Sequence, residues 1–103
     1  MATVDRSRVL HLTEPPGVLR HGTLDVKLTA PARPNVQTPH AQDEIYVVVR
    51  GRGVLCHDGK RDAFECGDLL FVAAAVEHHF EHGGDDLLVW RVFYGPAGGD
   101  VPA

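Results

Sequence analysis

The sequence predicts an all-β domain, built as a sandwich or a barrel. At least six short segments are rich in β-branched or alternating apolar residues, and turns of Gly, Pro, Asn and Asp separate them. No segment gives a convincing helix. The 103 residues are enough for one core. We therefore expect a single domain over residues 1–103, with loosely ordered ends at residues 1–8 and 97–103.

The first strands are expected on either side of a proline-rich turn. Val9–Leu12 alternates enough to be a short strand, and Glu14–Gly17 interrupts it with turn residues. This segment is expected to lie along an edge or to cross to a partner chain. Leu24, Val26 and Leu28 then alternate with polar residues, which predicts a half-buried strand whose apolar face looks into the core.

A loop followed by a strongly apolar strand comes next. Residues 30–35 hold two prolines and cannot form a central strand. Tyr46–Val49 is aromatic and β-branched, and Gly51 and Gly53 end it. The residues just before this strand are polar, so polar side chains are placed at the mouth of a β structure.

A β-hairpin is predicted over residues 54–66, with its turn at Asp58-Gly59. A two-residue turn sets a register in which Cys56 lies opposite Arg61 rather than Cys66. A disulfide is therefore disfavoured, and both cysteines are expected to be reduced thiols.

The last third of the chain begins with a turn at Gly67-Asp68 and a strand over Leu69–Val72 that is expected to be buried. A long strand over Leu87–Tyr94 closes the fold, and Gly95-Pro96 ends it.

The segment Ala73–His82 fits two structures. Its three alanines and a glutamate favour a helix with His78 and His82 on one face. In a strand, His78, Phe80 and His82 share one side and His79 faces the other. Local propensity alone leaves both open.

Charge and hydropathy exclude several kinds of partner. Ten Lys and Arg stand against fourteen Asp and Glu, a net charge of -4, and no basic cluster occurs. We expect no nucleic-acid partner and no binding to anionic membranes. The apolar runs are too short for a membrane helix, and the N-terminus has no signal-like apolar core, so a cytoplasmic protein is expected.

Residues 39–53 resemble the first motif of the cupin superfamily. His40, Glu44 and Gly51 have the spacing of its second histidine, its glutamate and its glycine. The first histidine of that motif would fall at Thr38.

Residues 67–82 resemble the second cupin motif, with Gly67 and His78 at the glycine and histidine positions. Ala73, Ala75 and His82 replace its usual proline, glycine and asparagine. Together the two motifs cover roughly residues 37 to 82. The resemblance implies a double-stranded β-helix, or jelly roll, with a strand rather than a helix at His78. It also implies a homodimer, because small cupin barrels are usually dimeric.

The resemblance further implies that His40, Glu44 and His78 bind one divalent transition metal, which could be Fe, Mn, Ni, Co or Zn. Two imidazoles and one carboxylate suit such an ion and leave coordination positions open. Without the second motif, His40 and Glu44 would more commonly belong to a solvated loop. Asp43 is the alternative carboxylate ligand, although it should face away once the strand has begun.

Five more residues are expected beside the ligands. Thr38 would hold a water or a substrate oxygen, Gln42 would contact substrate through its amide, and His82 would orient His78 or lie exposed at a strand end. The full set is Thr38, Gln42, Tyr46, Phe80 and His82.

Two function classes fit these residues. One is a metal-dependent enzyme, a dioxygenase, isomerase or lyase acting on a small molecule in the barrel. The other is a non-catalytic module that binds a small, sugar-like molecule. A general acid or base besides the ligands would separate them, and only Tyr46 and His82 are candidates. The sequence has no nucleophile elbow, phosphate-binding glycine loop or Cys-x-x-Cys pair.

Overall fold

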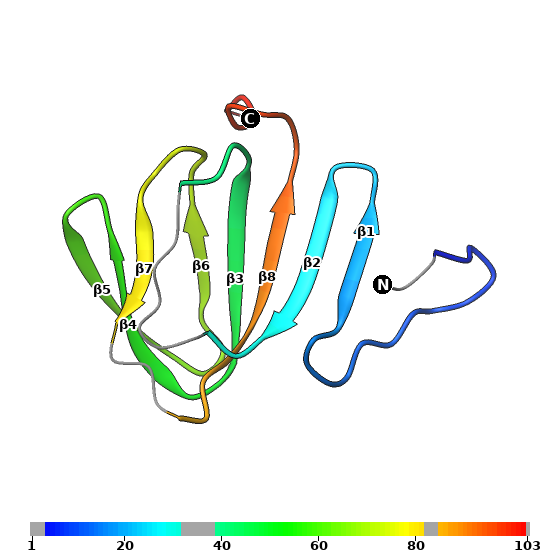
Figure 1. Cartoon of the computed structure of the whole chain (residues 1–103), viewed down its shortest axis with the longest axis horizontal. Coiled ribbons are helices and arrows are strands. Elements are labelled where there is room, and N and C mark those ends of the chain that lie inside the picture. Colours follow the sequence, from blue (N-terminus) through cyan, green and yellow to red (C-terminus); the bar gives the residue numbers. More distant parts are fainter. Residues whose placement is uncertain (1–3, 32–38, 82–84, 103) are drawn as a thin grey trace.

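The computed structural model describes residues 4–31, 39–81 and 85–102. Within these residues the chain forms strands and no helix, in two antiparallel sheets (Figure 1). The larger sheet has the order β1-β2-β8-β3-β6 and the smaller one β5-β4-β7. The strands are β1 (Val18–His21), β2 (Leu24–Thr29), β3 (Asp43–Arg50), β4 (Arg52–His57), β5 (Lys60–Glu65), β6 (Leu69–Val72), β7 (His78–Glu81) and β8 (Leu88–Tyr94). The predicted all-β jelly-roll fold is confirmed.

The core lies between the two sheets. In β3 the alternate residues Glu44, Tyr46 and Val48 are almost fully buried, because they point toward the smaller sheet. The smaller sheet contributes Leu55, Phe64 and Phe80 to the same core. Tyr46 and Phe80 meet edge to face, with ring centroids 4.8 Å apart. β3 therefore carries both core residues and the polar Glu44 on one face.

The hairpin between β4 and β5 forms as predicted. Asp58 and Gly59 have φ of 47° and 76°, the left-handed values that a two-residue turn needs. Cys56 pairs with Arg61 across the hairpin. Both cysteines are free thiols.

The segment that contains His78 is extended, as the family resemblance implies. Within residues 73–81 a turn at Ala74-Ala75 leads into β7, with no helix. His78 and Phe80 are buried, and His79 is exposed, which is the alternation of a strand. His82 lies outside the described residues.

The N-terminal strand prediction is wrong. Val9–Leu12 has no strand structure, whereas Val18–His21, which the sequence analysis missed, forms β1. β1 pairs with β2 at the edge of the larger sheet. Residues 10–13 instead border an apolar hollow of about 450 Å³ whose other walls are side chains of β2, β3 and β8. The segment lies against a sheet face and makes no ladder.

Two further predictions, about which side of a strand faces the space between the sheets, are also wrong, although Leu28 of β2 is buried as expected. Val26 pairs with Val92, which pairs with Ile45, and these residues lie on the face of the sheet opposite Tyr46. The apolar side of β2 therefore points away from the space between the sheets. The period of two gave the alternation correctly but not which side is inside.

The same reversal explains β6, which was expected to be buried. Leu69 and Phe71 pair with Val47 and Ile45 on the outer face and are 62% and 56% exposed. Only Val72 of this strand is buried. The outer face of the larger sheet is thus apolar and partly open.

In the described part of the chain, no helix is both long and apolar enough to cross a bilayer.

Gly51, which links β3 to β4, is required by both backbone conformation and space. Its φ is +85°, and a Cβ there would lie 2.8 Å from the Cα of Leu87. We expect Gly51→Ala to lower the free energy of unfolding by about 3 kcal/mol, measured by chemical denaturation. Gly59→Ala is the matched control, because its φ is +76° but nothing lies within 4 Å. It should cost about 1 kcal/mol. Equal losses would show that the contact with Leu87 has no effect.

Candidate metal centre

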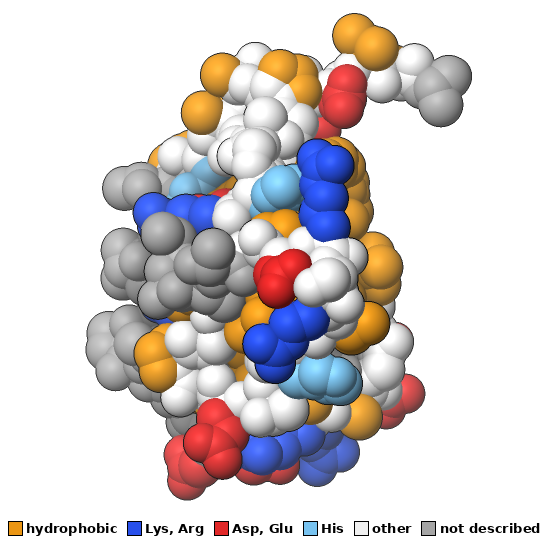
Figure 2. Space-filling view, turned by 90° about the vertical axis from the view of Figure 1, so that its right-hand side faces the viewer, with side chains coloured by type: hydrophobic (Ala, Val, Ile, Leu, Met, Phe, Trp, Pro, Cys, Tyr) orange, Lys and Arg blue, Asp and Glu red, His pale blue; other side chains and the backbone are white. Residues whose placement is uncertain are grey.

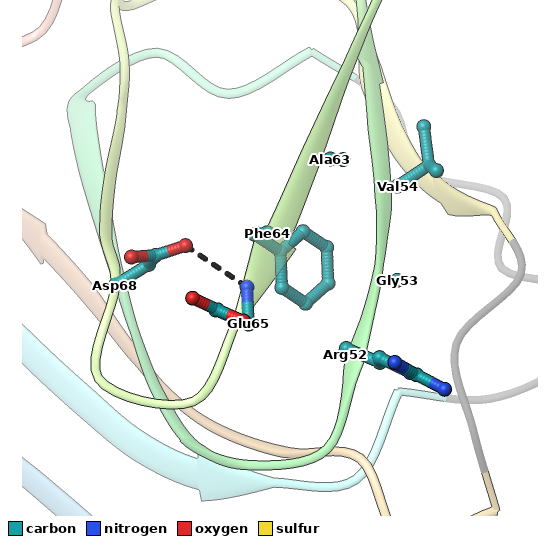
Figure 3. Close-up of a pocket in the computed structure, with 7 residues that line it drawn as sticks. All are labelled: Arg52, Gly53, Val54, Ala63, Phe64, Glu65 and Asp68. Carbon is teal, nitrogen blue, oxygen red and sulfur yellow. Dashed lines mark hydrogen bonds between the residues drawn. The ribbon is translucent and has the colours of Figure 1, made fainter.

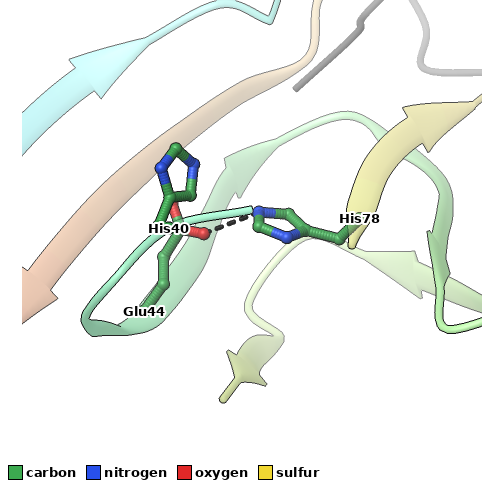
Figure 4. Close-up of side chains that lie close together, drawn as sticks. All are labelled: His40, Glu44 and His78. Carbon is green, nitrogen blue, oxygen red and sulfur yellow. Dashed lines mark ion pairs between the residues drawn. The ribbon is translucent and has the colours of Figure 1, made fainter. Parts of the chain in front are cut away.

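The structure brings the three predicted ligands together. His40 comes from the segment before β3, Glu44 is the second residue of β3, and His78 begins β7 (Figure 4). Each offers one ligand atom, and these atoms all lie within 4.8 Å of one another. Glu44 and His78 are only 1% and 3% exposed. Residues distant in the sequence thus meet between the two sheets.

The ring of His78 is held in one orientation by three neighbours. Its Nδ1 lies 2.9 Å from the carbonyl oxygen of Val76, which can only accept, so Nδ1 carries the hydrogen. Its Nε2 lies 2.7 Å from Glu44 Oε1 and 3.0 Å from the Tyr46 hydroxyl. Nε2 is therefore the atom directed at the cluster. This is the arrangement of a metal-binding histidine whose other nitrogen bonds the backbone.

The pKa shifts of the two histidines differ in direction. Burial lowers the pKa of His78, but hydrogen bonds to Glu44 and Val76 outweigh it, and the net pKa is raised. Burial lowers the pKa of His40, and the nearby His78 and Arg91 add to this against the attraction of Glu44. His40 is thus favoured as the neutral imidazole that binds metals.

Glu44 shows that these residues fit a cation. Among the described residues, its buried Oε2 has no hydrogen-bond partner. An ionised carboxylate in such a place costs on the order of several kcal/mol unless it is compensated. A divalent ion between Glu44, His40 and His78 would satisfy this oxygen and both ring nitrogens. The donor set, two imidazoles and one carboxylate, is one that transition metals accept.

The family model described as the Cupin domain matches residues 28–94. The chain belongs to the cupin family. The two motifs, the jelly-roll sheets and the meeting of His40, Glu44 and His78 agree with this membership.

Comparison with individual proteins supports the fold of this chain. An uncharacterised protein of Streptomyces coelicolor is 42% identical over 60 residues, which span 58% of this chain and 57% of that protein's length. A cupin protein from Bacteroides fragilis superposes with a TM-score of 0.59 at 23% identity, covering 76% of this chain and 70% of that one. Fe(II) HppE in complex with its substrate gives 0.67 at 15% identity, covering 89% and 60%. At these identities the two solved structures show a shared fold.

Asp43, weighed from the sequence as an alternative ligand, holds this cupin's loops together instead. Its Oδ1 accepts a hydrogen bond from the Ala74 N–H at 3.0 Å, and its Oδ2 accepts one from the Asp100 N–H at 2.9 Å. The Ala75 N–H also donates to the His40 carbonyl at 2.7 Å. The turn before β7 is therefore tied to the segment that carries His40, which positions the two halves of the cluster.

The other predicted neighbours differ in how the structure places them. Gln42 donates through its side-chain nitrogen to the carbonyls of Thr23 and Gly95, so its amide links strand ends, and its substrate contact stays a prediction. Tyr46 and Phe80 line the core beside His78. Thr38 and His82 lie outside the described residues.

Arg91 is a neighbour of the site that the sequence analysis missed. It lies on β8 with its guanidinium carbon 4.5 Å from the centre of the Phe93 ring, and that ring is 4.5 Å from His40. Asp25 accepts a hydrogen bond from Arg91 at 2.8 Å. The one signal in the sequence was a single charge inside an otherwise apolar strand, Leu88–Tyr94.

A separate hollow of about 450 Å³ lies where β4 and β5 meet the turn at Asp68 (Figure 3). Its walls are Arg52, Gly53, Val54, Ala63, Phe64, Glu65 and Asp68. The Asp68 carboxylate accepts the Glu65 backbone N–H at 2.9 Å, which closes the turn. The hollow contains none of the three candidate ligands.

Acid should weaken the loop contacts of Asp43. Its pKa is lowered from the ordinary 3.8 by the backbone hydrogen bonds from Asp100 and Ala74. The charged form of Asp43 therefore stabilises the fold at any pH above its ordinary pKa of 3.8. This contribution is lost as the pH falls through the lowered pKa of the folded protein. We expect Asp43→Asn to reduce unfolding stability at neutral pH, with a deficit that shrinks in acid, measured by chemical denaturation. The control Asp58→Asn makes the same charge change at an exposed turn. A deficit independent of pH would contradict this assignment.

Proposed function

We propose that this cupin binds one divalent transition metal through His40, Glu44 and His78 and acts on a small molecule held beside it in the barrel. The observation that carries the proposal is the buried Glu44 carboxylate, whose Oε2 has no hydrogen-bond partner among the described residues. Two imidazoles within 4.8 Å supply the remaining ligands. A bound ion would offset the cost of burying this carboxylate, and its binding free energy would add to the stability of the fold.

The chain's own residues define what such a site can do. His78 is oriented by Val76, and the Tyr46 hydroxyl lies 3.0 Å from the same ring nitrogen. A bound ion would supply Lewis acidity or, as Fe(II), dioxygen chemistry, at coordination positions that the three ligands leave open. Dioxygenase, isomerase and lyase activities all fit this set. The chain is similar in fold to HppE, an Fe(II) protein, which supports the proposal that this barrel can hold such a centre.

The second candidate is a non-catalytic module that binds a sugar-like ligand. The position of Tyr46 favours it, since this candidate for proton transfer is 1% exposed and its hydroxyl already contacts His78. A metabolite screen with metal-loaded and metal-stripped protein separates the two. Metal-dependent turnover identifies an enzyme, whereas metal-dependent binding without turnover identifies a binding module.

Removing ligands should remove metal binding. We expect the double variant His40→Ala, His78→Ala to lose binding of Mn²⁺, an ion that carboxylate ligands suit, in a titration followed by electron paramagnetic resonance. Elemental analysis of the untagged protein as purified identifies the native ion.

The exposed His21→Ala is the matched control and should keep Mn²⁺ affinity. Thr38→Ala should change it much less than either ligand variant. Undiminished Mn²⁺ binding in the double variant would place the site elsewhere.

We also infer that the protein works in the cytoplasm, without a nucleic-acid or membrane partner. The net charge of -4 supports the absence of polyanionic partners. The free thiols of Cys56 and Cys66 suit a reducing compartment.

We propose that two copies of this chain pair through the outer face of the larger sheet. Leu69 and Phe71 are exposed on this face, and Val9 and Leu10 of the N-terminal segment are 82% and 43% exposed. Figure 2 shows hydrophobic side chains along one margin of the molecule. A second copy buries these groups with a two-fold, self-complementary contact, which a small core makes favourable.

Light scattering at micromolar concentration should therefore give twice the chain mass of 11.2 kDa. Leu69→Glu with Phe71→Glu should shift the protein to monomer, because two charges would be buried in the interface. Val101→Glu, at an exposed apolar residue near the C-terminus, is the control and should leave the mass unchanged. A monomeric wild-type mass would rule out the dimer.

A further inference from the structure

A second cluster of metal-binding groups lies on the face of the smaller sheet that points away from the core (β4 and β7 in Figure 1). Because His78 and Phe80 of β7 point into the core, His79 and Glu81 point outward. Cys56 of β4 is the direct cross-strand partner of His79. We propose that Cys56, His79 and Glu81 form a thiolate-containing site for a divalent ion of the zinc type.

The distances suit one ion. The three ligand atoms lie within 4.8 Å of one another, and Cys56 Sγ lies 2.9 Å from Glu81 Oε2. Ligand atoms about 3.5 Å apart surround a tetrahedral zinc with its usual bond lengths, so small side-chain rotations close the site. The thiol proton now stands between Sγ and Oε2. The ion displaces this proton to solvent and bonds to sulfur, oxygen and an imidazole nitrogen, with no change of oxidation state.

Two further features support the site. The other oxygen of Glu81, Oε1, accepts a hydrogen bond from Arg61 at 2.6 Å, which orients the carboxylate with Oε2 toward the thiol. A hollow of about 250 Å³, lined by Cys56, His79 and Arg61 among others, adjoins the cluster. It leaves room for a water as the fourth ligand, as in zinc sites with three protein ligands.

The donor set selects the kind of ion. A thiolate and a carboxylate neutralise a divalent charge, and the soft sulfur favours zinc over magnesium or manganese. The hydrogen bond to Glu81, with burial, raises the pKa of the Cys56 thiol, so the ion must displace the thiol proton when it binds. The site is on the other face of the sheet from the His40 cluster, so it does not depend on the proposed function.

Cobalt(II) reports this site directly, because only a cysteine ligand produces a thiolate-to-cobalt charge-transfer band. We expect the band when Co²⁺ is titrated into the metal-stripped full chain under reducing conditions. Cys56→Ser should abolish it, whereas Cys66→Ser should retain it. His79→Ala should weaken Co²⁺ binding by more than the roughly 10- to 100-fold that losing an outer partner causes.

The His40→Ala, His78→Ala variant should keep the band, which separates this site from the central one. Far-ultraviolet circular dichroism checks that each variant is folded. Absence of the band in the wild-type chain, or its persistence in Cys56→Ser, would overturn the proposal.

Discussion

The buried carboxylate of Glu44 is the constraint on which the rest of the site depends. It stands on the core face of β3 beside Tyr46 and Val48, at 1% exposure, where an uncompensated charge is strongly disfavoured. His78 meets it from the smaller sheet, at 2.7 Å. Closing the two sheets over this pair brings a charged group into the core, and the fold needs either a shared proton or a cation there. The core can therefore pack around Glu44 only if the cluster compensates its charge.

Hydrogen bonds between the loops around the cluster fix the positions of the segments that carry its residues. Asp43 precedes Glu44 and uses both oxygens to bind the backbone of Ala74 and Asp100, so the turn before β7 and a segment beyond β8 are fastened to β3. The His40 carbonyl accepts the neighbouring Ala75 N–H. Asp43 and Glu44 are neighbours in β3 and point to opposite faces of the sheet, as strand alternation dictates. The Asp43 carboxylate binds backbone amides, whereas the Glu44 carboxylate points into the core and joins the cluster.

Much of this was predictable from sequence, for identifiable reasons. Motif spacing placed His40, Glu44 and His78 together, and turn chemistry at Asp58-Gly59 gave the register of Cys56. The side of burial was not predictable for β2 and β6, because alternation has the same period whichever face is inside. In β2 the polar residues face inward, where Asp25 pairs with Arg91 near the site. The prediction of a strand over Val9–Leu12 was wrong because apolar residues of this segment lie against a sheet face and do not pair with a neighbouring strand.

A crystal structure of the metal-loaded protein, with anomalous diffraction at the absorption edge of the bound ion, tests whether His40, Glu44 and His78 bind the metal. We expect a peak between the two sheets, at bonding distance, about 2.0–2.2 Å for zinc, from His78 Nε2, a Glu44 oxygen and a His40 ring nitrogen. A map with no peak there, in which His78 Nε2 and Glu44 Oε1 still lie 2.7 Å apart, would contradict it.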